Sequence, residues 1–257
     1  MSAIPKIIHC CWFGPNPFPQ SFKQNIETWK KYCPDYEIKI WTEDNIDVNV
    51  SKYLKSARNH KKWAFMSDYV RLYVLYKYGG IYLDTDVELI KSLDPLLNNE
   101  MFTGLEEADS IATGLILGSI KKNQTIRKLL SLYDSRGDNI VNGQFVESTC
   151  VEITTKFFFE NGFEYVNKNQ KVLNCQIFST RYFCPQRPGS YKIRIRPETY
   201  TIHHYSASWF QEKGIKKRVK YRSIYYKYLL RRFLVKIVGI NNMENLRSWY
   251  RNLKRTK

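Results

Sequence analysis

The amino-acid sequence predicts an α/β protein with a mostly parallel central sheet and a basic, helical C-terminal tail. Short apolar segments alternate with helical segments along the first 212 residues, a pattern typical of strands joined by crossover helices. Basic residues are concentrated after that point. We therefore expect one large domain over residues 1–212, followed by a tail over residues 213–257.

Apolar or β-branched runs bounded by turn residues predict the strands, and apolar residues at helical spacing predict the helices. In chain order, strands are expected over Lys6–Phe13, Tyr36–Trp41, Ile81–Leu83, Met101–Leu105, Ala112–Gly118 and Tyr200–Tyr205. Helices are expected over Gln20–Tyr32, His60–Tyr78, Gln124–Tyr133 and Glu147–Asn161. The long helix should end at Gly79 and Gly80, since glycine commonly terminates helices.

The segment after this glycine pair carries the main chemical signal. If the backbone stays extended, Tyr82, Asp84 and Asp86 point to one face, because side chains alternate along a strand. Two carboxylates on one side repel each other unless a cation lies between them. Oxygen ligands suit Mg²⁺ or Mn²⁺, which usually bind carboxylates together with substrate phosphates. The segment therefore predicts a metal–diphosphate site at the carboxyl end of a strand, where ligands bind in such sheets.

Asp68 and Arg71 lie three residues apart on the preceding helix and so share one face. Next to the aspartate segment, the acid is suited to sugar hydroxyls and the guanidinium to phosphate. An ordinary surface ion pair is the alternative.

The composition is typical of a folded soluble protein, with 43% hydrophobic and 25% charged residues. No apolar run reaches the roughly 20 residues that span a bilayer, and the N-terminus lacks the layout of a signal peptide. The six cysteines show neither zinc-site spacing nor a disulfide framework, which favours buried free thiols in a reducing compartment. We expect a cytoplasmic protein.

The net charge of +17 is located mainly in the tail, where residues 213–257 hold 15 Lys or Arg and one acid. Apolar residues between Tyr225 and Val238 recur at helical spacing. A basic amphipathic helix of this type binds anionic membrane surfaces. Packing on its own domain and binding of nucleic acid are the alternatives.

The ordered segments Ala64–Leu72 and Tyr76–Asp86 resemble glycosyltransferase family 32. The opening run Ile4–Gly14 and the segment Trp29–Trp41 are also similar to that family. The likeness is close over residues 4–96 and fainter over residues 201–209. The family includes bacterial capsule and surface-polysaccharide transferases and a yeast initiating mannosyltransferase, and it is similar to the glucosylating clostridial toxins.

The resemblance implies a GT-A type fold and metal-dependent, retaining transfer from a nucleotide-sugar. Trp12 would then stack on the nucleotide base, with Tyr82 near the base and ribose. Asp68 and Arg71 would hold the donor sugar. Asp84 would bind the metal partly through water, and Asp86 would bind it directly.

Family members of this kind often complete the metal shell with a late histidine, for which His204 matches better than His203. Imidazole among carboxylates favours Mn²⁺ over Mg²⁺. Trp209 would cover the diphosphate. Glu106, Glu107 and Gln144 are candidates for acceptor contacts, with solvated loop residues as the alternative.

The leading interpretation is a membrane-associated transferase on the cytoplasmic face that extends a lipid-linked glycan, as in bacterial capsule biosynthesis. A UDP-sugar is favoured over a GDP-sugar, and nucleic acid is not expected as a partner. The alternatives are an aspartate-based phosphotransferase of the haloacid-dehalogenase class and a non-enzymatic nucleic-acid binder. Glu88 departs from the phosphotransferase motif, and the binder leaves the aspartate segment unexplained.

Overall fold

The computed structural model describes residues 3–141, 143–146, 148–187, 190 and 192–205, together with residues 223, 226 and 230. The chain divides into two compact units, Met1–Pro185 with Arg194–His204, and Gln186–Ile193 with Tyr205–Lys257. The first unit contains the central sheet. Trp209 and nearly all of the basic tail lie outside the described residues, so the tail helix and the boundary at residue 212 stay predictions.

The strands of the described region are β1 (Ile7–Cys11), β2 (Glu37–Trp41), β3 (Gly80–Tyr82), β4 (Val87–Leu89), β5 (Met101–Glu107), β6 (Ser110–Ile111), β7 (Leu117–Ser119), β8 (Ile140–Val141), β9 (Gln144–Phe145), β10 (Gln170–Val172), β11 (Cys175–Phe178) and β12 (Thr201–His203). The helices are α1 (Gln20–Tyr32), α2 (Lys52–Asn59), α3 (Trp63–Tyr78), α4 (Gln124–Asp134), α5 (Cys150–Glu160) and α6 (Thr180–Phe183).

Within these residues the central sheet has eight strands, in the order β10-β11-β5-β7-β3-β1-β2, with β6 paired to β5. Strand β1 runs parallel to β2 and β3, and β11 runs parallel to β5. Strand β7 is antiparallel to both β3 and β5, so those two strands point the same way. The predicted α/β fold with a mostly parallel sheet is confirmed, and it agrees with the GT-A type that the resemblance implies.

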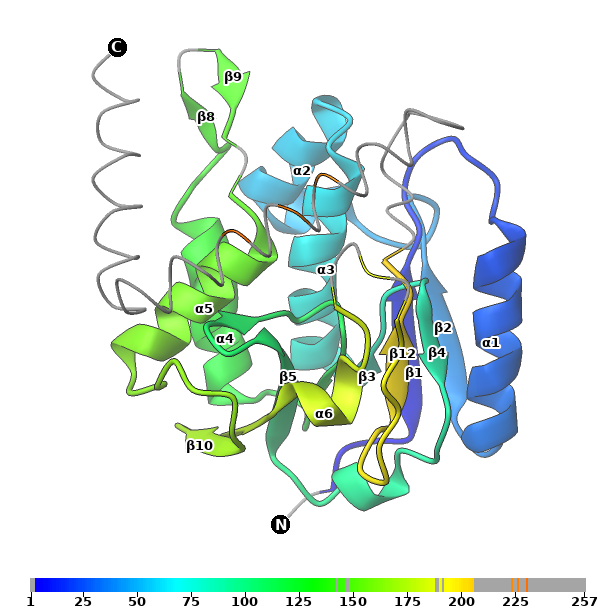
Figure 1. Cartoon of the computed structure of the whole chain (residues 1–257). Coiled ribbons are helices and arrows are strands. Elements are labelled where there is room, and N and C mark those ends of the chain that lie inside the picture. Colours follow the sequence, from blue (N-terminus) through cyan, green and yellow to red (C-terminus); the bar gives the residue numbers. More distant parts are fainter. Residues whose placement is uncertain are drawn as a thin grey trace. The chain divides into compact units, whose positions relative to one another are not determined.

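Helices cover both faces of this sheet (Figure 1). Helix α3 packs against β1, β3 and β7 and also contacts α2 and α4, while α5 contacts β6. The apolar residues of this layer form a buried cluster that includes Tyr53, Val70, Leu117, Ile126 and Phe158. Helix α1 packs instead against β4, which forms a separate two-stranded sheet with β12.

The structure differs from the predicted elements most clearly between residues 112 and 118. Only Leu117–Ser119 forms a strand there, and a turn precedes it, closed by a hydrogen bond from Leu115 N to Ala112 O of 3.2 Å. Helices α2 and α6 and strands β4, β6, β8, β9, β10 and β11 were not predicted. Among the described residues, no helix combines the length and apolar character that a membrane span requires.

Candidate active site

The site is built where the carboxyl ends of β1 and β3 meet. These strands pair with Ile8 opposite Ile81 and His9 opposite Tyr82. Strand β3 ends at Tyr82, and a turn closed by Val87 N and Asp84 O at 3.1 Å leads into β4. Asp84 and Asp86 therefore lie at the predicted edge of the sheet, but in a turn rather than on an extended strand.

Helix α1 holds this turn through side chains that the sequence did not single out. The buried Asn25 donates from Nδ2 to Thr85 O at 2.9 Å, directly between the two aspartates. Trp29 Nε1 donates to Val87 O at 2.8 Å, and Thr28 Oγ1 accepts from Leu89 N at 3.0 Å. Three backbone groups of the turn and β4, at alternate residues, are thus fixed from one helix face.

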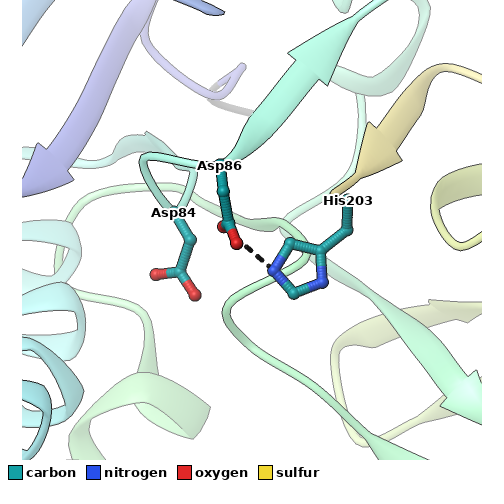
Figure 2. Close-up of side chains that lie close together, drawn as sticks. All are labelled: Asp84, Asp86 and His203. Carbon is teal, nitrogen blue, oxygen red and sulfur yellow. Dashed lines mark ion pairs between the residues drawn. The ribbon is translucent and has the colours of Figure 1, made fainter. Parts of the chain in front are cut away.

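Asp84, Asp86 and His203 form the candidate metal centre, shown in Figure 2. One ligand atom from each of the three lies within 4.8 Å of the others. His203 Nε2 is 3.0 Å from Asp86 Oδ1. Two carboxylates and one imidazole form a donor set suited to Mn²⁺ or Mg²⁺.

The field of the site favours a cation at this position. Burial lowers the pKa of His203, but the neighbouring Asp86 carboxylate outweighs it and raises that pKa to about 9. Asp84 and Glu106 add to the same effect. The acidic cluster therefore favours a positive charge at this position, and a bound metal ion would require a neutral His203 because a ligating imidazole must be neutral.

The two histidines have different partners. Backbone N–H of His204 donates to Asp86 O at 3.0 Å, while its imidazole Nε2 lies 2.8 Å from Glu88 Oε2. Strand β12 pairs with β4 so that His203 lies opposite Val87. We therefore revise the preference for His204: the structure brings His203 to the aspartates and directs His204 to Glu88.

Arg71 is held on all sides by the protein. Its Nε donates to Ser67 O at 3.2 Å, and its Nη1 donates to Thr113 Oγ1 at 3.3 Å and to Cys150 Sγ at 3.6 Å. Its Nη2 faces Asp68 Oδ1 at 3.0 Å and Asp84 Oδ1 at 3.4 Å. Each of the three guanidinium nitrogens therefore has a protein partner, Nε and Nη1 through hydrogen bonds and Nη2 through ion pairs.

The ion pair of Asp68 and Arg71 is buried, with 7% and 4% of each residue exposed, so the surface-pair alternative is excluded. Burial opposes the charge of Arg71, but Asp84 and other neighbours keep its pKa well above the usual value. Burial raises the pKa of Asp68, although Arg71 acts against it. Arg71 in this arrangement orients Asp68 and Asp84, rather than offering a free fork to phosphate.

The turn before β7 and the start of α5 complete the surroundings of Asp84. Asp84 Oδ1 accepts from Tyr82 Oη at 2.9 Å, and Asp84 N donates to Gly114 O at 3.2 Å. A Cβ added at Gly114 would overlap Asp84 Oδ2, so only glycine allows this carboxylate its position. Thr113 and Cys150 reach the site through Arg71. Gly114 within this apolar run was the sequence feature that could have indicated the turn. A strand over Ala112–Gly118 was predicted there instead.

The remaining predicted residues lie as follows. Trp12 follows β1 and is half-buried, stacked on Phe22 with ring centroids 6.0 Å apart. Glu106 is half-buried at the end of β5, and its charge raises the pKa of His203, which places it near the metal centre. Gln144 is exposed on β9, where it pairs with Val141. The structure does not test the roles predicted for these residues.

Comparison with known proteins agrees with this geometry. Residues 19–103 match the family described as "Glycosyltransferase sugar-binding region containing DXD motif". This part of the chain is therefore similar to the DXD-containing glycosyltransferases. The matched region contains Asp68, Arg71, Asp84 and Asp86, and it confirms the resemblance inferred from the sequence.

Proteins similar to this region include fungal and viral ones. Inositol phosphoceramide mannosyltransferase 3 of Schizosaccharomyces pombe is 38% identical over 101 residues, which cover 38% of this chain and 28% of that protein. "Uncharacterized glycosyltransferase L373" of Acanthamoeba polyphaga mimivirus is 25% identical over 222 residues, which cover 80% of this chain and 84% of that protein. The chain spans only 28% of the first fungal relative and 34% of the next two.

Solved structures with a similar course of the chain include the PaToxG glycosyltransferase. It has a TM-score of 0.49 and 19% identity, and the match covers 62% of this chain and 69% of that one.

Proposed function

We propose that the protein is a metal-dependent glycosyltransferase that moves a sugar from a nucleotide-sugar to a glycan or lipid-linked acceptor. The observation that carries this proposal is the cluster of Asp84, Asp86 and His203 inside a chain with a DXD sugar-binding region. An acid cluster that draws a proton onto His203 is suited to a divalent cation and to the diphosphate such a cation binds.

In this proposal Asp86 and His203 hold the metal directly, and Asp84 holds it partly through water. The bound metal would act as a Lewis acid on the charge that grows on the leaving diphosphate. Asp68, oriented by Arg71, accepts hydrogen bonds from hydroxyls of the donor sugar. Trp12 and Tyr82 contact the nucleotide, and Trp209 covers the diphosphate.

The names of the fungal relatives bear on donor and acceptor. Inositol phosphoceramide mannosyltransferases, by name, act on a lipid that contains phosphate. This supports a lipid-linked acceptor and makes GDP-mannose a donor to test beside the UDP-sugars favoured from the sequence. The proposal also includes transfer with retention of the anomeric configuration, Mn²⁺ as the metal ion, and a role in bacterial surface-glycan synthesis.

A donor panel tests the proposal. Hydrolysis of UDP-glucose, UDP-galactose, their N-acetyl forms and GDP-mannose is measured with Mn²⁺, Mg²⁺ or EDTA. We expect one donor to be hydrolysed with metal only, and the anomer released first to match the donor. Absence of metal-dependent turnover or binding with every donor would contradict the proposal.

We further propose that the protein is peripheral on the cytoplasmic face of the membrane, based on the charge of residues 213–257. Co-sedimentation with vesicles tests this placement. The full chain should pellet with anionic but not with neutral vesicles, and a chain without residues 213–257 should pellet less. Equal pelleting with both lipids would count against a charged membrane contact.

A further inference from the structure

Helix α2 carries an unusual distribution of charge. Lys52, Lys55 and Arg58 are exposed and follow one another at spacings of three residues. Five Lys or Arg and no acid occur between Asp47 and Asp68. Like charges three residues apart destabilise a helix. Lys52 and Lys55 also lie in the first turn, where the helix dipole disfavours cations.

In the described part of the protein these charges have little compensation, because only Asp138 lies in the same lining as Lys52 and Lys55, and only Arg58 lies in the last turn, where the dipole favours a cation. No ion pair joins Lys52, Lys55 or Arg58 to a carboxylate there, whereas Lys156 and Lys168 each pair with a Glu four residues away. The helix is otherwise well formed, because Ser51 Oγ caps it by accepting from Tyr53 N at 3.2 Å. A sequence that breaks a local rule with little compensation points to a function at that place.

A cavity of about 300 Å³ lies beside the same helix. Its α2 side presents Lys52, Lys55, Asn59 and His60, and Asp138 and Ile140 lie on the other side, at the start of β8. His60 Nδ1 donates to Ser56 O at 2.9 Å, which fixes the ring. Asp138 Oδ1 accepts from Ile140 N at 3.2 Å. Two ammonium groups and the Asn59 amide can donate to an oxyanion, and His60 adds a donor at Nε2 when it is protonated, while the carboxylate of Asp138 acts against an anion.

The cavity is on the side of the molecule where transfer would occur. Helix α3 ends at Tyr78, and β3 starts at Gly80 and runs back, so the start of α3 lies toward the carboxyl end of β3. Helix α2 ends at Asn59, shortly before α3 begins at Trp63. Figure 1 shows α2 and the β8–β9 hairpin together at the upper end of the view.

We propose that this cavity binds a phosphate group and, resting on the proposed glycosyl transfer, that the phosphate belongs to the acceptor. Lys52 and Lys55 supply the charge, Asn59 supplies a directed donor, and His60 donates from Nε2 in its protonated form. The site is separate from the metal centre, where the diphosphate of the donor would bind. The positive charge on α2 lowers the stability of the helix and provides the binding energy for the anion.

The test uses the full chain and inorganic phosphate as the probe, at constant ionic strength kept with chloride. The side-chain resonance of His60, assigned with His60→Gln, reports binding. The variant is Lys52→Gln/Lys55→Gln, and the matched control is Lys128→Gln/Lys171→Gln, which removes the same charge from two exposed positions on α4 and β10. We expect saturable binding by wild type and control, and binding about tenfold weaker or more in the variant.

A second readout separates this role from a structural one. Without phosphate, the Lys52→Gln/Lys55→Gln variant should unfold at higher urea concentration than wild type, since it loses like-charge repulsion. Lower stability of the variant, equal phosphate binding by variant and control, or no saturable binding by wild type would each overturn the proposal. Phosphate binding needs no turnover, so it can fail or succeed independently of the donor panel.

Vesicles of phosphatidylinositol and of phosphatidylcholine identify the source of the phosphate. Variant and control both keep residues 213–257, so a difference between them reports α2 alone. Weaker pelleting of the variant with phosphatidylinositol assigns the phosphate to a lipid headgroup. Phosphate binding with equal pelleting of the two proteins assigns it to a soluble phosphate ester.

Discussion

At the scale of single residues, the buried Asp68–Arg71 pair limits which substitutions are informative. Removing one member leaves an uncompensated buried charge, which costs about 3–5 kcal/mol. Loss of activity in such a variant would report stability as well as chemistry. Gly114 offers a cleaner test, because it touches Asp84 without carrying a charge.

Gly114→Ala should fold and lose most of its activity. The backbone at Gly114 has an ordinary φ, so alanine adds no backbone strain, but its Cβ would displace the Asp84 carboxylate. We expect kcat to fall by about 10²-fold or more, because misplacement of a charged group near the reacting atoms has such effects. Steady-state kinetics of Gly114→Ala and wild type measures this fall in kcat.

Gly137→Ala is the matched control. Gly137 has φ of +60°, so alanine strains the backbone there, but its Cβ meets nothing within 4 Å. It should lower stability slightly and leave kcat unchanged. Equal kcat for Gly114→Ala and wild type would contradict the proposed role of Asp84.

At the scale of secondary-structure elements, α1 orders the metal-binding turn. Asn25→Ala removes the hydrogen bond to Thr85 O and leaves that carbonyl without its α1 partner. We expect a loss of about 1–3 kcal/mol in the free energy of unfolding and weaker Mn²⁺ binding, measured by electron paramagnetic resonance titration. Gln24→Ala, at an exposed position of the same helix, should change neither quantity.

The sequence predicted elements that a local pattern defines. It did not predict elements whose existence depends on pairing with strands far away in the chain. Helix α1 has the predicted bounds, because its periodicity is continuous. Strand β4 has three residues and is defined by pairing with β12, more than a hundred residues away. That register also decides between His203 and His204, since neighbouring residues of a strand face opposite ways. No local pattern contains this information.

At the scale of the whole molecule, His9 connects three parts of the sheet. Trp41 Nε1 donates to His9 Nδ1 at 3.1 Å, so the neutral ring must carry its proton on Nε2, which donates to Gly79 O at 2.9 Å. Burial lowers the pKa of His9 to about 4 from its ordinary value of 6.5. Strand β1, strand β2 and the glycine turn before β3 are thus joined by one neutral imidazole.

This shift predicts loss of stability in acid. The unfolded chain takes up a proton on His9 below pH 6.5, whereas the folded protein resists it until about pH 4. Stability from this group is therefore complete above pH 6.5 and is lost as the pH falls toward 4, by about 3 kcal/mol. Urea unfolding across this range measures it. His9→Gln should lack this part of the pH dependence, and identical profiles for both proteins would refute the assignment.

The account as a whole depends on a divalent ion held between Asp86, Asp84 and His203. Calorimetric titration of UDP and of GDP into the wild-type protein and into Asp86→Asn, each with Mn²⁺ and with EDTA, tests it most directly. We predict that wild type binds one of these nucleotides only with Mn²⁺ and that the folded variant binds neither. Equal nucleotide binding in EDTA, or by Asp86→Asn, would contradict the claim.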